Sequence, residues 1–137
     1  MKVPYFLTFF AATVSSQNVV LGLPAGQNLA PGSSTVVQIQ KPMTLTGSQE
    51  VTVVIGLSSC VEYKCYPAAD TMGTILYIGP YDPEQHEYSQ PPYQNITVTI
   101  PQAIPKGNAQ LNLAHFSLVA TSAWPYLETL NQTVLIV

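Results

Sequence analysis

The feature that most constrains the fold is an alternation of apolar and polar residues with a period of two. In one run, the residues on one side of an extended chain are all aliphatic: Val51, Val53, Ile55 and Leu57. A second run places Ile96, Val98 and Ile100 on one face and Asn95, Thr97 and Thr99 on the other. This alternation is typical of a β-strand with one buried face.

Similar but shorter patterns predict further strands at 19–23, 35–40, 74–78, 110–120 and 133–137. Turn-forming residues (Gly, Pro, Ser, Asn and Asp) separate the runs. The 12 prolines and 8 glycines, with only 8 % charged residues, leave little material for long exposed helices. We therefore expect an all-β fold, an immunoglobulin-like β-sandwich of about seven strands. The segment at 124–130 is expected to form a turn or a single helical turn, because Pro125 suits a first helical turn.

Residues 1–16 have the pattern of a secretory signal peptide. Lys2 supplies the positive charge, residues 5–12 form a largely apolar stretch, and residues 14–16 form a small-residue cleavage site. A transmembrane helix needs about 20 apolar residues, so no membrane anchor is expected. The mature chain is predicted to be one secreted, extracellular β-sandwich domain, residues 17–137.

The two cysteines, Cys60 and Cys65, are predicted to form a local disulfide in an oxidising compartment. Such a short loop gains about 2 kcal/mol in the chain-entropy model, and it is too short to join two sheets about 10 Å apart. A metal site would need more ligands than the cysteines, His86 and His115 supply at these spacings. No metal and no cofactor are expected.

Two N-glycosylation sequons, at Asn95 and Asn131, agree with export. The strand pattern around Asn95 points its side chain at solvent. The net charge of −3, with four lysines and no arginine, argues against a nucleic-acid partner.

Binding is the better-supported class of function, because tyrosines gather around the cysteine loop and a Pro-rich stretch at 79–94. Tyrosine offers a large amphipathic contact area at low entropic cost, so these residues suit either sugars or proteins, although Tyr77 and Tyr93 could instead pack in strands. The predicted binding surface is Tyr63, Tyr66, Tyr81, Asp82, Tyr88 and Tyr93.

Catalysis is not expected, and the chain is predicted not to be an enzyme. It has no Gly-x-Ser-x-Gly motif, and Asp82, Glu84 and Glu87 share one Pro-rich loop rather than a rigid frame. A solvated acidic loop is the favoured interpretation. His115 lies in an apolar run and is expected to be hydrogen-bonded in or near the core.

Segments at 23–25, 29–34, 50–57, 72–80, 98–101, 104–107, 114–119 and 131–134 resemble fungal effectors of the necrosis-inducing secreted protein type. The resemblance implies a small secreted fungal protein, a monomer in our expectation, that acts on a host plant. It further implies binding to receptor-associated immune kinases, modulation of immunity or cell death, and no catalysis or cofactor. Translocation into host cells after secretion is left open by the sequence. A non-catalytic cell-wall or carbohydrate-binding module is the alternative.

Overall fold

The computed structural model describes residues 18–44 and 46–137, so the predicted signal peptide lies outside the described residues. Within the described part, no helix is long and apolar enough to span a membrane. Regular secondary structure there consists of strands β1 (Val20–Gly22), β2 (Asn28–Leu29), β3 (Ser34–Gln40), β4 (Ser48–Ser59), β5 (Thr74–Pro80), β6 (Tyr93–Thr99), β7 (Gly107–Val119) and β8 (Trp124–Ile136).

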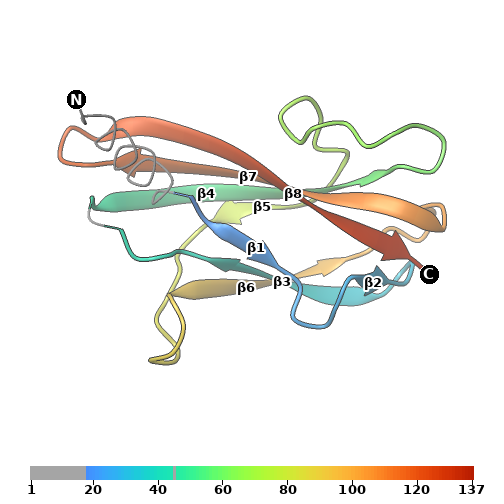
Figure 1. Cartoon of the computed structure of the whole chain (residues 1–137), viewed down its shortest axis with the longest axis horizontal. Coiled ribbons are helices and arrows are strands. Elements are labelled where there is room, and N and C mark those ends of the chain that lie inside the picture. The colour runs from blue at the N-terminus through green and yellow to red at the C-terminus, as the bar shows by residue number, and fades with distance from the viewer. Residues whose placement is uncertain (1–17, 45) are drawn as a thin grey trace, which may run out of the picture.

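The strands form two sheets that pack face to face (Figure 1). The smaller sheet has the order β1-β3-β6, and the larger has the order β2-β8-β7-β4-β5. The all-β prediction is confirmed, while the immunoglobulin-like topology stays a prediction. The two-residue strand β2 was not predicted; it pairs parallel with the end of β8, Asn28 opposite Leu135.

The core lies between the inner faces of the two sheets. Val37 and Ile39 of β3 belong to one core cluster with Ile55 of β4 and Leu113 of β7, and all four are fully buried. Burial of each such side chain contributes about 1.5–3 kcal/mol. The alternation predicted for β6 is confirmed, because its aliphatic residues are buried while Asn95, Thr97 and Thr99 are exposed.

The predicted inward position of Val51 is wrong, because β4 contains a bulge. The pairing of β4 with β7 shifts between Glu50 and Thr52, so Val51 is the extra residue and is exposed. An extra residue reverses the alternation along a strand. Glu50 therefore lies on the same face as Val53 and points inward, in the place that an unbroken alternation assigns to Val51.

The predicted turn at 124–130 is also wrong, because this segment is the first half of β8. It pairs with β7 without interruption, from Val119–Trp124 to Gly107–Ile136. The turn between the strands is made by Ala120 and Ala123, both with positive φ (64° and 56°). Pro125 is tolerated because β8 has no neighbour on its other side at that point.

Candidate binding surface

The residues predicted to form one tyrosine-rich surface are divided between two loops. The disulfide loop, residues 60–73, follows β4, and the Pro-rich loop, residues 81–92, follows β5. They lie at opposite ends of β5, whose seven residues span about 20 Å. In Figure 1 the disulfide loop stands above the larger sheet at the upper right, and the Pro-rich loop hangs at the lower left. The structure therefore does not bring the two groups together.

Two tyrosines at the Pro-rich loop are not surface residues. Tyr81 is 2 % exposed, and its hydroxyl donates a hydrogen bond of 3.1 Å to the Ile39 carbonyl. Tyr93 is 8 % exposed, exchanges backbone hydrogen bonds with Glu84 and stacks on His86 at 4.1 Å. The assignment of Tyr81 to the binding surface is wrong, because its ring turns into the core. Tyr93 begins β6 and lines the hollow described next, but His86 stacks on its ring and leaves little of it exposed.

The remaining predicted residues of this loop, Asp82 and Tyr88, are exposed. Asp82, Glu84 and His86 line an open hollow of about 370 Å³ beside Asn95. All three side chains are exposed to solvent there. Among the residues that the structure describes, no group of three His, Cys, Asp or Glu side chains could hold a metal ion.

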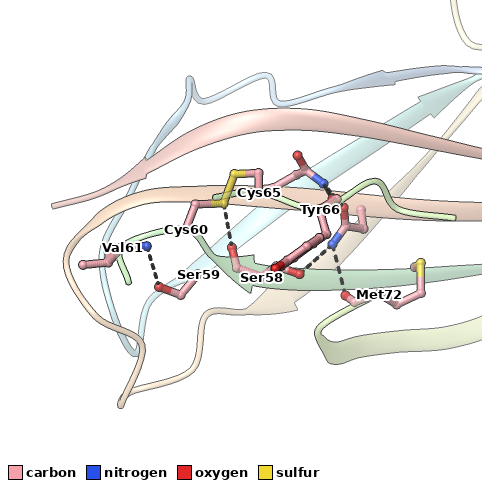
Figure 2. The surroundings of a disulfide bond; sticks show 9 residues. Ser58, Ser59, Cys60, Val61, Cys65, Tyr66 and Met72 are labelled. Carbon is pink, nitrogen blue, oxygen red and sulfur yellow. Dashed lines mark hydrogen bonds between the residues drawn. A yellow bond between two sulfur atoms is a disulfide. The ribbon is translucent and has the colours of Figure 1, made fainter. Parts of the chain in front are cut away.

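The disulfide loop is pinned at both ends (Figure 2). The predicted Cys60–Cys65 disulfide is confirmed, with the two Cα atoms 5.0 Å apart. The Gln110 amide donates to the Tyr66 carbonyl at 2.7 Å, and the Asn112 amide donates to the Met72 carbonyl at 3.2 Å. These two amides lie on the outer face of β7 and are buried because the loop covers them. They act as anchors that replace water as partners of the loop carbonyls.

Gly56 allows the loop to lie this close to the sheet. A Cβ atom at this position would be 2.0 Å from the Met72 carbonyl oxygen, a distance at which the loop must move. The return to β5 uses Gly73, whose φ of +72° is unfavourable for other residues.

Exposed tyrosines line a cleft where this loop meets the sheet. Tyr63 is 70 % exposed and Tyr66 is 50 % exposed. Neighbouring hollows of about 390 Å³ and 250 Å³ extend the cleft toward Pro105. The part between loop and sheet, about 330 Å³, is called here the disulfide-loop cleft and is lined by Leu57, Ser58, Ser59, Tyr63, Lys64, Tyr66, Thr71, Gly73 and Thr74.

Both sequon asparagines are on strands and exposed. Asn95 lies on β6 in the outer face of the smaller sheet, where its side-chain oxygen accepts a hydrogen bond from Gln38. Asn131 lies on β8 in the outer face of the larger sheet. Glycosylation at either site stays a prediction.

The prediction for His115 is confirmed, since it is 1 % exposed and hydrogen-bonded through both ring nitrogens. Its Nδ1 lies 2.7 Å from Glu128 Oε2, and its Nε2 lies 2.5 Å from Glu50 Oε1. The same Glu128 oxygen accepts the Val19 backbone N–H at 3.0 Å. A neutral imidazole has one N–H, so two carboxylate partners favour the doubly protonated cation. The three side chains form a buried ionic cluster that ties β4, β7 and β8 to the chain before β1.

The electrostatics of this cluster favour its charged form. Burial by itself lowers the pKa of His115, but the hydrogen bonds and charges of the two carboxylates outweigh it and raise the pKa to about 9. Burial by itself raises the pKa of Glu50, but His115, Ser48 and Lys41 hold it below its usual value. Burial, then the two carboxylates, raise the pKa of Tyr81, which packs edge-on against the imidazole.

The fold and the cleft define a small all-β sandwich protein with exposed tyrosines on a disulfide-closed loop. The sequence model of the Nis1 family matches residues 16–135, and the chain belongs to that family. A search of curated proteins finds no match.

Proposed function

We propose that this protein is a secreted fungal effector that binds immune receptor-associated kinases of a host plant and so modulates immunity or cell death. The observation that carries the proposal is membership of the Nis1 family over nearly the whole chain, together with the resemblance of its strand and turn segments to necrosis-inducing secreted effectors. The disulfide, confirmed between Cys60 and Cys65, suits an oxidising compartment.

The disulfide-loop cleft is the surface that we assign to the partner. Tyrosine is among the residues that most often dominate binding energy at protein interfaces, and two tyrosines lie exposed there beside Lys64. The disulfide and the buried amide anchors hold the loop in place before binding. A preformed loop loses little conformational entropy on association, which favours affinity.

The test is binding of the oxidised protein, secreted with its own leader, to recombinant cytoplasmic domains of plant immune receptor kinases at physiological salt. Tyr63→Ala and Tyr66→Ala are each expected to weaken binding about 30-fold, the effect of a 2 kcal/mol contact. Tyr88→Ala is the matched control, because Tyr88 is fully exposed at the other end of the sandwich. It should change affinity less than twofold.

Two results would contradict the proposal in different ways. Absence of saturable binding by the unmodified protein would remove the kinase as partner. Equal affinity of the Tyr63→Ala, Tyr66→Ala and Tyr88→Ala proteins would leave the partner in place and remove the cleft as its binding surface. Melting temperatures of all variants should agree, since these side chains are exposed.

Carbohydrate binding is the second candidate, and the exposed pair Tyr63 and Tyr66 favours it, because sugar rings stack on aromatic side chains. Co-sedimentation with chitin, β-glucan and cellulose tests it directly. Protein that stays entirely in the supernatant would count against this function, and a pellet fraction that Tyr63→Ala abolishes would support it.

A further inference from the structure

The outer face of the larger sheet, the face turned away from β1, β3 and β6, carries no charged side chain on any of its described strands. The charged residues of β4, β7 and β8 are Glu50, His115 and Glu128, and all three point inward. The solvent face of an antiparallel sheet is ordinarily polar. Here the outward residues of these strands are all neutral, either polar, such as Thr129, Asn131 and Thr133, or apolar, and the charged residues point inward.

The outer face is instead apolar over a continuous area. Leu127 of β8 and Ile78 of β5 are 67 % and 69 % exposed, and Ile75 is 46 % exposed. In the strand register, Leu127 lies opposite Phe116 of β7, and Ile78 lies opposite Val54 of β4. The patch therefore crosses β8, β7, β4 and β5, four of the five strands of the larger sheet. We call it the outer apolar face.

Its size argues against a stable interface between two copies of the chain. From β8 to β5 the sheet measures about 14 Å, and from Pro125 to Asn131 about 20 Å, a flat area of roughly 300 Å². A standard protein interface buries about 800 Å² on each partner. The disulfide loop covers the next part of the sheet through Gln110 and Asn112, so the face does not extend further in that direction.

Asn131 stands at the border of this face. On β8 the residues 128, 130, 134 and 136 point toward the core, so Asn131, Thr129 and Leu127 share the outer side. Thr133, the hydroxyl residue of the sequon, lies on the same side and is exposed. An oligosaccharide attached to Asn131 would begin next to Thr129, its neighbour on the same face of the strand, and Leu127 is the next residue on that face.

We propose that an N-linked glycan on Asn131 lies across the outer apolar face and shields it from water. Sugar rings offer an apolar C–H face together with hydroxyl groups. The outer apolar face offers matching partners: aliphatic side chains, the hydroxyl of Thr129, and the hydroxyl oxygen of Thr52, which donates to the Gly79 carbonyl at 2.7 Å and can still accept. It offers no charge to be desolvated. The glycan is attached within reach of the face, so covering it requires no loss of translational and rotational entropy, only the ordering of the sugar chain.

The second sequon provides an internal comparison. Asn95 lies on the outer face of the smaller sheet, next to Thr97 and hydrogen-bonded to Gln38. A glycan there has polar neighbours and no large exposed aliphatic side chain on its own strand. Loss of this glycan should expose little apolar surface.

The experiment uses the full chain secreted from a yeast host, with site occupancy measured by mass spectrometry. Binding of the dye ANS, which reports exposed apolar surface, and sedimentation velocity are compared for Asn131→Gln, Thr133→Ala and the control Asn95→Gln. We expect Asn131 to be occupied. The first two variants should bind several-fold more dye while sedimenting as monomers, since the face is too small for a stable interface, and Asn95→Gln should behave as the unmodified protein.

Three further measurements separate loss of the glycan from other effects of the substitutions. Trimming of the folded glycoprotein by an endoglycosidase should reproduce the Asn131→Gln effect without a folding step. Thr133→Ser retains the sequon and should retain low dye binding. Leu127→Thr with Ile78→Thr, added to Asn131→Gln, should return dye binding to its low level, because it removes the two most exposed aliphatic side chains.

The inference needs the export that belongs to the proposed function, but it does not need kinase binding. Protein that is not secreted would contradict export. Secreted protein with an unoccupied Asn131, or equal dye binding of Asn131→Gln and Asn95→Gln, would overturn the glycan proposal alone. Dimers of the fully glycosylated protein that Leu127→Thr dissolves would also overturn it and assign the face to a second copy.

Discussion

The buried ionic cluster of Glu50, His115 and Glu128 predicts that the protein loses stability at alkaline pH. His115 titrates near 6.5 in the unfolded chain and near 9 in the folded protein. The folded state therefore holds one more proton between these values. The stabilisation is complete below about pH 6.5 and is lost as the pH rises through 9. Between pH 6.5 and pH 9, each pH unit lowers the free energy of unfolding by about 1.4 kcal/mol. The total loss of stability over this range is about 3 kcal/mol.

Glu128→Gln is the perturbation that isolates this effect. One oxygen of Glu128 accepts both the His115 Nδ1–H and the Val19 N–H. The amide oxygen of glutamine can accept the same two hydrogen bonds, while the negative charge is removed. The pKa of His115 should fall toward its usual value, and the alkaline loss of stability should shrink to less than half.

Urea unfolding at pH 6 and at pH 9.5 measures both quantities, with the free energies obtained by linear extrapolation. The charge partners near the imidazole are Glu50, Glu128 and Lys41, and the neutral ring of Tyr81 packs against it. A free energy of unfolding that is equal at the two pH values would refute the charged cluster. An equal loss in the Glu128→Gln protein would refute the part assigned to Glu128.

The remaining predictions concern the core and the loop. Ile55→Ala should lower the free energy of unfolding by about 2–4 kcal/mol, because Ile55 is fully buried; Thr97→Ala, measured on unglycosylated protein, should change it by less than about 0.5 kcal/mol. Gly56→Ala should cost about 2 kcal/mol by forcing the Met72 carbonyl away, and Gly47→Ala, with nothing within 4 Å of the added Cβ, should not destabilise. Tyr81→Phe should cost about 1 kcal/mol through its lost hydrogen bond to Ile39. Urea unfolding measures each, and equal effects of Gly56→Ala and Gly47→Ala would contradict the close approach of the loop.

The sequence predicts a strand correctly wherever apolar and polar residues alternate regularly, as in β6. The prediction fails where the strand is irregular or very short. The bulge at Val51 turns the Glu50 side chain from the outer to the inner face of the sheet. No residue type at this point of the sequence indicates a bulge. β2 has only two residues, too few to show any period. The segment at 124–130 contains Pro125 and Glu128, which weakened the strand pattern, although Glu128 shares the parity of the buried Val134 and Ile136.

The candidate site was predictable in its chemistry and only partly in its geometry. The cysteine spacing sufficed for the disulfide, because a link of five residues has one plausible outcome in an oxidising compartment. Tyr81 is buried because it packs against the smaller sheet, where its hydroxyl donates to the Ile39 carbonyl. The local sequence around Tyr81 does not show which distant strand will cover it. Gln110 and Asn112 are buried anchors only because the disulfide loop lies over them, and no pattern in the sequence shows where that loop folds.

The pairing of β2 with the end of β8 sets the order in which the chain can be completed. Residues 28 and 29 find their partners only at 135 and 136, and β8 is also the neighbour that β7 needs. A ribosome makes the chain from its N-terminus, so the apolar strands β3, β4 and β6 emerge long before the strand that closes the larger sheet. Transiently exposed strands of this kind are prone to aggregate. Nascent chains of this protein should therefore depend on chaperones until translation ends, and prematurely terminated chains should be degraded rather than accumulate as folded fragments.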